Sequence, residues 1–200
     1  MSGAEGEGVT VTEHLRLPRR RESYVWPRDD ADWYVEPTWC SIRLFAVESF
    51  VGHVHDPAAG MGRIVEAARA HGLPATGADI VDRSFGFMVQ DFALATEPVD
   101  NIVTNPPFAL ARQFVDHALA LARRKIAILF PIARLNAARW LEDTSFRQLW
   151  LLTPRPSMPP GEVILRGEKP GGGKTDFAWL VFEQGYTGEP AIGWLRREVQ

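Results

Sequence analysis

Four consecutive residues, Asn105-Pro106-Pro107-Phe108, combine groups that can act on an aromatic amino group. Such a nitrogen is a poor nucleophile because its lone pair is delocalised into the ring. If acceptors hold both N–H bonds, the nitrogen can pyramidalise and direct its lone pair at an electrophile. The side-chain oxygen of Asn105 and the backbone carbonyl of Pro106 are suitable acceptors. The two proline rings stiffen the turn and Phe108 can stack on a base. The alternative is an ordinary turn after a strand.

Three other segments contain residues that suit a nucleotide-like cofactor. Each lies at the carboxyl end of an expected strand, where open parallel sheets bind ligands. The first has small residues that let the backbone approach a ligand, and it precedes a helix with free N–H groups. The second ends in an acidic residue that can accept hydrogen bonds from ribose hydroxyl groups. The third pairs a carboxylate, for an adenine amino group, with an aromatic ring. The segments contribute Asp56, Pro57, Ala58, Gly60 and Gly62, then Asp79 and Ile80, then Asp91 and Phe92.

Apolar patterning predicts the elements that position these residues. Helices are expected within 39–51, with Ile42, Phe45, Ala46 and Ser49 on one face, and over 63–71. A third is expected over 109–123, with Leu110, Phe114, Ala118 and Leu121 buried. Strands are expected in 52–56, 74–80, 85–92, 101–104, 125–132, 148–156 and 177–185. Alternation of strands and helices predicts an α/β fold with a parallel sheet covered on both faces.

This set of motifs resembles the Rossmann-like S-adenosylmethionine-dependent amino-methyltransferases. Within them it is most similar to DNA adenine-N6 methyltransferases of the small phage and prophage type. The segment Trp-Tyr-Val-Glu-Pro-Thr at 33–38 resembles the N-terminal cofactor motif of that family, which makes Pro37 and Thr38 candidate cofactor residues. The similarity extends over roughly residues 26–197.

The resemblance implies a seven-stranded sheet, mostly parallel, whose last strand is antiparallel. It implies S-adenosyl-L-methionine as cofactor, Asn105 beside it, DNA as partner, and a base flipped out of the duplex. No metal is required. Residues 1–24 are expected to be a disordered tail, and 25–200 a single methyltransferase domain without a separate target-recognition domain.

Composition and charge restrict the class of protein further. The 200 residues include one cysteine, carry a net charge of -3 and contain no apolar run long enough for a bilayer, which fits a cytoplasmic protein with no membrane partner. The charge is uneven, because residues 123–174 contain 10 basic and 4 acidic residues. Arg155, Arg166, Lys169 and Lys174 lie in a Pro/Gly-rich excursion, 154–176, that is suited to phosphate contact. The oligomeric state stays open.

Other functions with similar motifs stay open as well. RNA adenine, guanine N2 or protein glutamine methylation would use the same core, and a cofactor-binding pseudoenzyme is a further alternative. Cytosine-C5 methylation needs a cysteine nucleophile in a Pro-Cys pair, and Cys40 follows Trp39, which favours a buried apolar role. His53 and His55 alternate on a strand without further metal ligands nearby.

Overall fold

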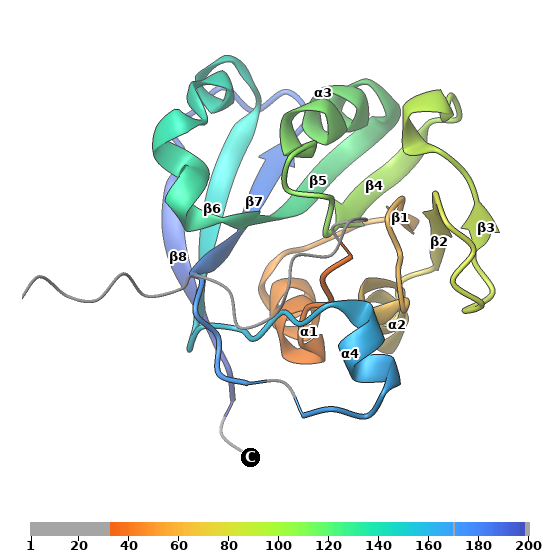
Figure 1. Ribbon diagram of the computed structural model, residues 1–200. Coiled ribbons are helices and arrows are strands. Elements are labelled where there is room, and N and C mark those ends of the chain that lie inside the picture. Colours follow the sequence, from red (N-terminus) through yellow and green to blue (C-terminus); the bar gives the residue numbers. More distant parts are fainter. Residues whose placement is uncertain (1–32, 170, 199–200) are drawn as a thin grey trace, which may run out of the picture.

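The computed structural model describes residues 33–169 and 171–198 of the chain, so the expected tail, 1–24, lies outside the described residues. Eight strands form one sheet in the order β3-β2-β1-β4-β5-β7-β6-β8 (Figure 1). The strands are β1 (Val54–Asp56), β2 (Ala75–Asp79), β3 (Met88–Val89), β4 (Val99–Thr104), β5 (Ala122–Pro131), β6 (Phe146–Thr153), β7 (Phe177–Glu183) and β8 (Ala191–Arg196). Seven of these strands run in one direction, and β7 runs antiparallel to both of its neighbours, β5 and β6.

The expected α/β fold with a mostly parallel sheet is confirmed, and two details of the expectation need correction. Within the described residues the sheet has eight strands instead of seven, and the antiparallel strand β7 is followed by β8, which pairs parallel with β6. The pattern of β8 hid it, because this edge strand leaves Ile192 and Trp194 more than half exposed and so lacks a continuous buried run.

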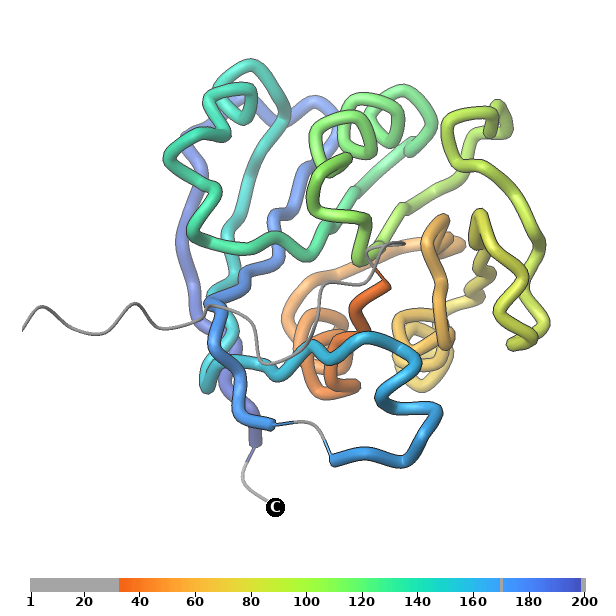
Figure 2. Tube along the Cα trace, in the orientation of Figure 1, coloured from red at the N-terminus to blue at the C-terminus, as the bar shows by residue number. Residues whose placement is uncertain are grey.

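Helices lie on both faces of the sheet. One face carries α1 (Thr38–Val47) and α2 (Arg63–Ala70), and the other carries α3 (Ala111–Leu121) with short 3-10 turns (Figure 1). The excursion after β6 contains the short helix α4 (Gly161–Leu165) and runs back alongside α1 and α2 (Figure 2). Within the described residues, no helix has both the length and the apolar character needed to span a bilayer.

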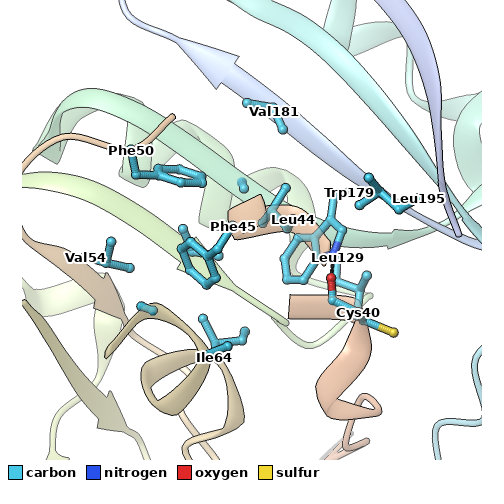
Figure 3. Packing of buried hydrophobic residues seen from close by; sticks show 14 of the residues in the cluster. Cys40, Leu44, Phe45, Phe50, Val54, Ile64, Leu129, Trp179, Val181 and Leu195 are labelled. Carbon is cyan, nitrogen blue, oxygen red and sulfur yellow. Dashed lines mark hydrogen bonds between the residues drawn. The ribbon is translucent and has the colours of Figure 1, made fainter. Parts of the chain in front are cut away.

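The core follows from strands that are apolar at every position. In β7, Trp179 and Val181 point to the face of α1 and α2, while Leu180 and Phe182 point to the opposite face, and all four are fully buried. Figure 3 shows Trp179 packed among Leu44, Leu129 and Leu195, where its indole N–H donates to the Cys40 carbonyl at 3.1 Å. Because both faces of the central strands are covered, their sequences show runs instead of alternation.

The expected faces of two helices were partly wrong. In α1 the buried residues are Cys40, Ser41, Leu44 and Phe45, whereas Ile42 is 39% exposed. In α3 they are Ala111, Val115, Ala118 and Leu121, whereas Leu110 is exposed. Both helices have apolar residues on more than one side, so periodicity alone could not select the face that meets the sheet. In α2, which alternates charged and apolar residues clearly, Ile64, Val65 and Ala68 are buried as expected.

Candidate active site

A cleft lies at the carboxyl ends of β1, β2 and β4. Its volume, including the open mouth, is about 800 Å³. Most of the candidate cofactor and catalytic residues line it. They are Asp56, Pro57, Ala58, Gly60, Asp79, Ile80, Asp91, Phe92, Asn105 and Pro107. The cleft thus brings together segments separated by up to about fifty residues, because the carboxyl ends of neighbouring parallel strands share one edge of the sheet.

The loop between β1 and α2 requires glycine at two positions. Gly60 and Gly62 have φ angles of +50° and +83°, a region that other residues rarely adopt. A Cβ on Gly62 would lie 2.4 Å from the Phe87 ring, and one on Gly60 would lie 2.8 Å from the Trp33 indole nitrogen. Gly62 does not line the cleft; it precedes α2 and sets the direction in which that helix begins.

Asp79 holds this loop to the end of β2. Its Oδ2 accepts the Gly60 N–H at 2.9 Å and its Oδ1 accepts the Val81 N–H at 3.0 Å. The Arg83 Nε lies 3.4 Å from Oδ1, and the Arg83 guanidinium stacks on Trp33 at 4.0 Å from the ring centroid. Asp79 is therefore buried but paired, and its Oδ2, which has one partner, keeps a second lone pair for a ligand hydroxyl.

In the third candidate segment, Asp91 is exposed whereas Phe92 is buried. Asp91 is exposed and its Oδ1 accepts the Ala93 N–H at 3.0 Å. Phe92 is 6% exposed and packs against Phe114 and His117 with ring centroids 5.0 and 4.8 Å away. Phe92 therefore exposes little surface to the cleft, whereas Ile80, which is 63% exposed, presents apolar surface there.

Asn105 follows β4, and its side chain is fixed by two acceptors. Nδ2 donates to the Tyr34 carbonyl at 2.9 Å and to Glu36 Oε2 at 3.0 Å. Glu36 is 5% exposed, and its own backbone carbonyl accepts from Arg63 at 2.7 Å. Burial raises the pKa of Glu36, an effect that its hydrogen bonds and the charge of Arg63 oppose.

The other three residues of the motif, Pro106, Pro107 and Phe108, differ in their position relative to the cleft. Pro106 is buried and Pro107 lines the cleft. The Phe108 ring is parallel to the Tyr34 ring, with centroids 6.3 Å apart and an interplanar angle of 8°, and it also contacts Phe177 at 5.4 Å. Phe108 lies outside the cleft, beside Tyr34, which lines it.

A further buried carboxyl group lies beneath the loop. Asp56, at the end of β1, is 1% exposed and its Oδ1 accepts the Ala58 N–H at 3.1 Å. Burial, reinforced by the nearby charges of Glu36 and Asp79 and opposed by hydrogen bonds, raises its pKa to about 8. The cleft floor thus contains two acidic groups that would ionise more readily beside a positive charge.

The segment 33–36 is the part of the cleft that sequence patterns described least well. It crosses the cleft because the Val35 N–H donates to the Pro159 carbonyl and the Gly161 N–H donates to the Trp33 carbonyl, both at 3.0 Å. Trp33, Tyr34 and Glu36 therefore line the cleft, whereas the candidates Pro37 and Thr38 lie outside it, before and at the start of α1. In the sequence this segment was notable only through its resemblance to a known cofactor motif. Its position in the cleft depends on contacts with residues far away in the chain, which no local pattern predicts.

Beside the cleft lies a second depression that we call the arginine groove. It contains three arginines, Arg63, Arg155 and Arg197, and the aromatic Trp39, and its volume with the open mouth is about 740 Å³. None of the described residues that line it is acidic. Arg63 lines both hollows, so they share a wall. Arg155 Nε is 2.6 Å from Asp176, but both side chains are about half exposed, so the pair is weak and open to competition.

The basic sector of the sequence is not one basic face. Lys125 and Arg147 lie near the amino ends of β5 and β6, on the side of the sheet opposite the cleft. There they contact the buried Glu48 at distances of 3.0 and 2.5 Å. In the excursion, Arg166 turns to Glu168 at 2.7 Å, and Lys169 and Lys174 do not line the groove. Of the four basic residues expected to meet phosphate, only Arg155 lies in the arginine groove.

The residues considered for other chemistries have ordinary environments. Cys40 is fully buried and burial raises the pKa of its thiol. The His55 Nδ1 is 3.0 Å from the Thr76 hydroxyl. Within the described residues, no group of three or more His, Cys, Asp or Glu side chains could hold a metal ion.

Comparison with solved structures identifies the fold. No protein-family profile and no curated sequence matches the chain. The modification subunit of a provisionally assigned type I restriction enzyme from Vibrio vulnificus is similar at a TM-score of 0.55 and 15% identity, over 86% of this chain and 48% of that one.

A provisionally assigned RNA methyltransferase from Pyrococcus horikoshii matches at a TM-score of 0.53 and 17% identity, over 73% and 80% of the two chains. A protein described as a predicted O-methyltransferase from Agrobacterium tumefaciens matches at 0.53 and 13%, over 81% and 86%. The chain therefore has the Rossmann-like methyltransferase fold.

Proposed function

We propose that the protein is an S-adenosylmethionine-dependent methyltransferase that acts on an exocyclic amino nitrogen, with adenine N6 in DNA as its substrate. The observation that carries this proposal is the environment of Asn105. Its Nδ2 is used by two acceptors, so Oδ1 is the atom left for a substrate N–H, and it is presented at the edge of a cleft with the features of a nucleoside site.

The described residues fit this cofactor. Asp79 Oδ2 offers a free lone pair for a ribose hydroxyl, and Ile80 and Phe92 offer apolar surface for an adenine ring. Asp91 lies next to them and can accept from the adenine amino group. The buried carboxyl groups of Asp56 and Glu36 suit the positively charged methionine end, because a cation stabilises their ionised forms.

When bound, S-adenosylmethionine supplies an electrophilic methyl group on a sulfonium. The Asn105 side-chain oxygen and the Pro106 carbonyl accept the two N–H bonds of the target nitrogen, which directs its lone pair at that methyl carbon. The bound cofactor would thus supply the methyl group and leave as a neutral thioether, and the methylated nitrogen would lose its proton to water. Phe108 supports the base face.

Two features favour a nucleic acid as substrate. The arginine groove adjoins the cleft at Arg63 and offers guanidinium groups and an indole, a combination that suits phosphates and bases. The ion pair of Arg155 with Asp176 is half exposed and open to competition by a phosphate. The paired rings of Tyr34 and Phe108 next to Asn105 suit a flat aromatic substrate. A base in a duplex would have to be flipped out to reach the cleft.

The test is methyl transfer from tritiated S-adenosylmethionine to separate pools of DNA, RNA and protein, with Asn105→Ala as the matched control. We expect label in DNA adenine, and a variant that binds cofactor normally but transfers nothing. Label in RNA or in protein glutamine would replace the substrate with one of those alternatives. Cofactor binding without transfer to any pool would identify a pseudoenzyme.

A further inference from the structure

The orientation of the Asn105 amide is determined by what surrounds it. The Tyr34 carbonyl can only accept a hydrogen bond, and it lies 2.9 Å from Nδ2. Glu36 Oε2 lies 3.0 Å from the same nitrogen. If the amide turned over, its oxygen would face two acceptors and two hydrogen bonds would be lost. The amide group therefore has one stable orientation, with Oδ1 directed away from the segment 33–36.

Glu36 is itself held rigidly. The neighbouring residues Trp33 and Val35 make backbone hydrogen bonds with 159–161, and Arg63 of α2 donates to the Glu36 carbonyl. Trp33 fills the space where Gly161 has no side chain, because a Cβ there would lie 2.3 Å from its ring. The carboxylate thus belongs to a segment anchored at both sides of the cleft.

The hydrogen bond from Asn105 Nδ2 matters for Glu36 because the carboxylate is buried. The charged group that acts on it is Arg63 from α2, which favours the ionised form. Together with burial, the charge of Glu36 in turn raises the pKa of Asp56 from β1 and of the Cys40 thiol from α1, so all three groups lie close together. A buried carboxylate that loses a hydrogen-bond partner is destabilised strongly. The Nδ2 donor of Asn105 is one of the groups that offset the cost of burying Glu36.

We propose that Glu36 is a positioning residue that directs Asn105 Oδ1 toward the target amino group by accepting a hydrogen bond from Asn105 Nδ2. The inference rests on the proposed function, because it assumes that Oδ1 receives a substrate N–H. It adds a residue from a segment more than sixty positions earlier in the chain to the catalytic motif.

The test exchanges donor and acceptor between the two side chains. Asn105→Asp places two carboxyl groups about 3 Å apart, and like charges at that distance disfavour ionisation of both. Adding Glu36→Gln supplies an amide that donates to one oxygen of the new carboxylate and leaves its other oxygen toward the substrate. We expect the double variant to turn over about tenfold or more faster than Asn105→Asp alone. Recovery should be partial because the Tyr34 carbonyl still faces an oxygen.

The control for a general effect of removing a buried charge is Glu48→Gln. Glu48 is also 5% exposed, but it lies at the opposite edge of the sheet and contacts Lys125, Arg147 and Trp150. Glu48→Gln combined with Asn105→Asp should give no recovery. Equal recovery with both glutamine variants, or none with Glu36→Gln, would overturn the positioning role.

A second readout separates this inference from the proposed function. Unfolding of the four cofactor-free proteins in denaturant gives a double-mutant cycle that needs no activity. We expect Glu36→Gln to offset part of the stability lost in Asn105→Asp. Additive changes would show that the contact is absent and overturn the inference, even in an active enzyme. A wild-type protein inactive on every pool would instead overturn the proposed function, while the cycle would still decide whether Glu36 orients Asn105.

Discussion

The carboxylate of Asp79 binds the backbone of Gly60, with Oδ2 and the Gly60 N–H 2.9 Å apart, across 19 positions of sequence. This contact joins the end of β2 to the glycine loop after β1. An acidic residue that the sequence assigned to the cofactor alone therefore also shapes the loop that would surround it. Substitutions of Asp79 are expected to affect both the loop and the ligand.

We expect Asp79→Ala to weaken S-adenosylmethionine binding by about tenfold or more, since a hydrogen bond to a charged group contributes roughly 1.5–3 kcal/mol. Isothermal titration calorimetry measures the dissociation constant. Asp82→Ala is the matched control, because Asp82 caps the neighbouring turn through the Ser84 N–H and does not line the cleft. An unchanged dissociation constant in Asp79→Ala would remove Asp79 from the cofactor site.

We expect Phe108→Ala to reduce turnover on nucleic acid more than Phe108→Tyr or Phe108→Trp. Stacking of a base on an aromatic side chain contributes roughly 1–3 kcal/mol. Phe108 also packs against Phe177, so the free energy of unfolding must be measured on each variant to separate a folding defect from a binding defect. Equal turnover by the Ala and Trp variants would argue against a stacked base.

Asp56 should make the stability of the cofactor-free protein depend on pH. Its folded-state pKa, about 8, lies above the value of roughly 3.9 expected for an unfolded Asp. Between these values the unfolded chain is ionised while the folded protein retains the proton. The contribution of Asp56 is thus fully present below about pH 4 and is lost as the pH rises through 8, by at most about 1.4 kcal/mol per pH unit.

Denaturant titrations between about pH 5 and 8 measure this effect. Asp56→Asn has no proton to release, so its free energy of unfolding should fall less steeply with pH than that of the wild type. Asp116→Asn, which changes an exposed carboxylate on α3, should leave the slope unchanged. Parallel slopes for wild type and Asp56→Asn would contradict a raised pKa at this position.

The arginine groove should determine the salt sensitivity of DNA binding. We expect Arg155→Gln with Arg197→Gln to weaken binding of a single-stranded oligonucleotide and to reduce the slope of log affinity against log salt by about one to two units. Fluorescence anisotropy over a range of salt concentrations measures both quantities. Arg124→Gln, an exposed position at the opposite edge of the sheet, should change little. A slope equal to that of the wild type would exclude phosphate contact in the groove.

The sequence by itself determined the elements and the order of the chemical groups. The run 125–132 predicted a central strand because a strand covered on both faces is apolar at every position, whereas 177–185 was expected as a closing strand and lies inside the sheet as β7. Asp56 and Asp79 end β1 and β2 and Asn105 follows β4, so parallel topology alone was enough to expect them at one end of the strands. Strand β8 escaped prediction because an exposed edge strand needs no continuous apolar run.

Only the tertiary structure decided which face of α1 and α3 is buried and which groups act on the site from a distance. Glu36 and Tyr34 reach Asn105 because 159–161 holds their segment across the cleft, and no local pattern encodes a pairing between positions so far apart. The positions of the charged side chains also depend on the tertiary structure. The basic residues of 123–174 come from one stretch of sequence, yet Lys125 and Arg147 pair with the buried Glu48 while Arg155 joins Arg63 and Arg197 in a groove. The reason is that Lys125 and Arg147 lie near the amino ends of β5 and β6, whereas Arg155 follows the carboxyl end of β6.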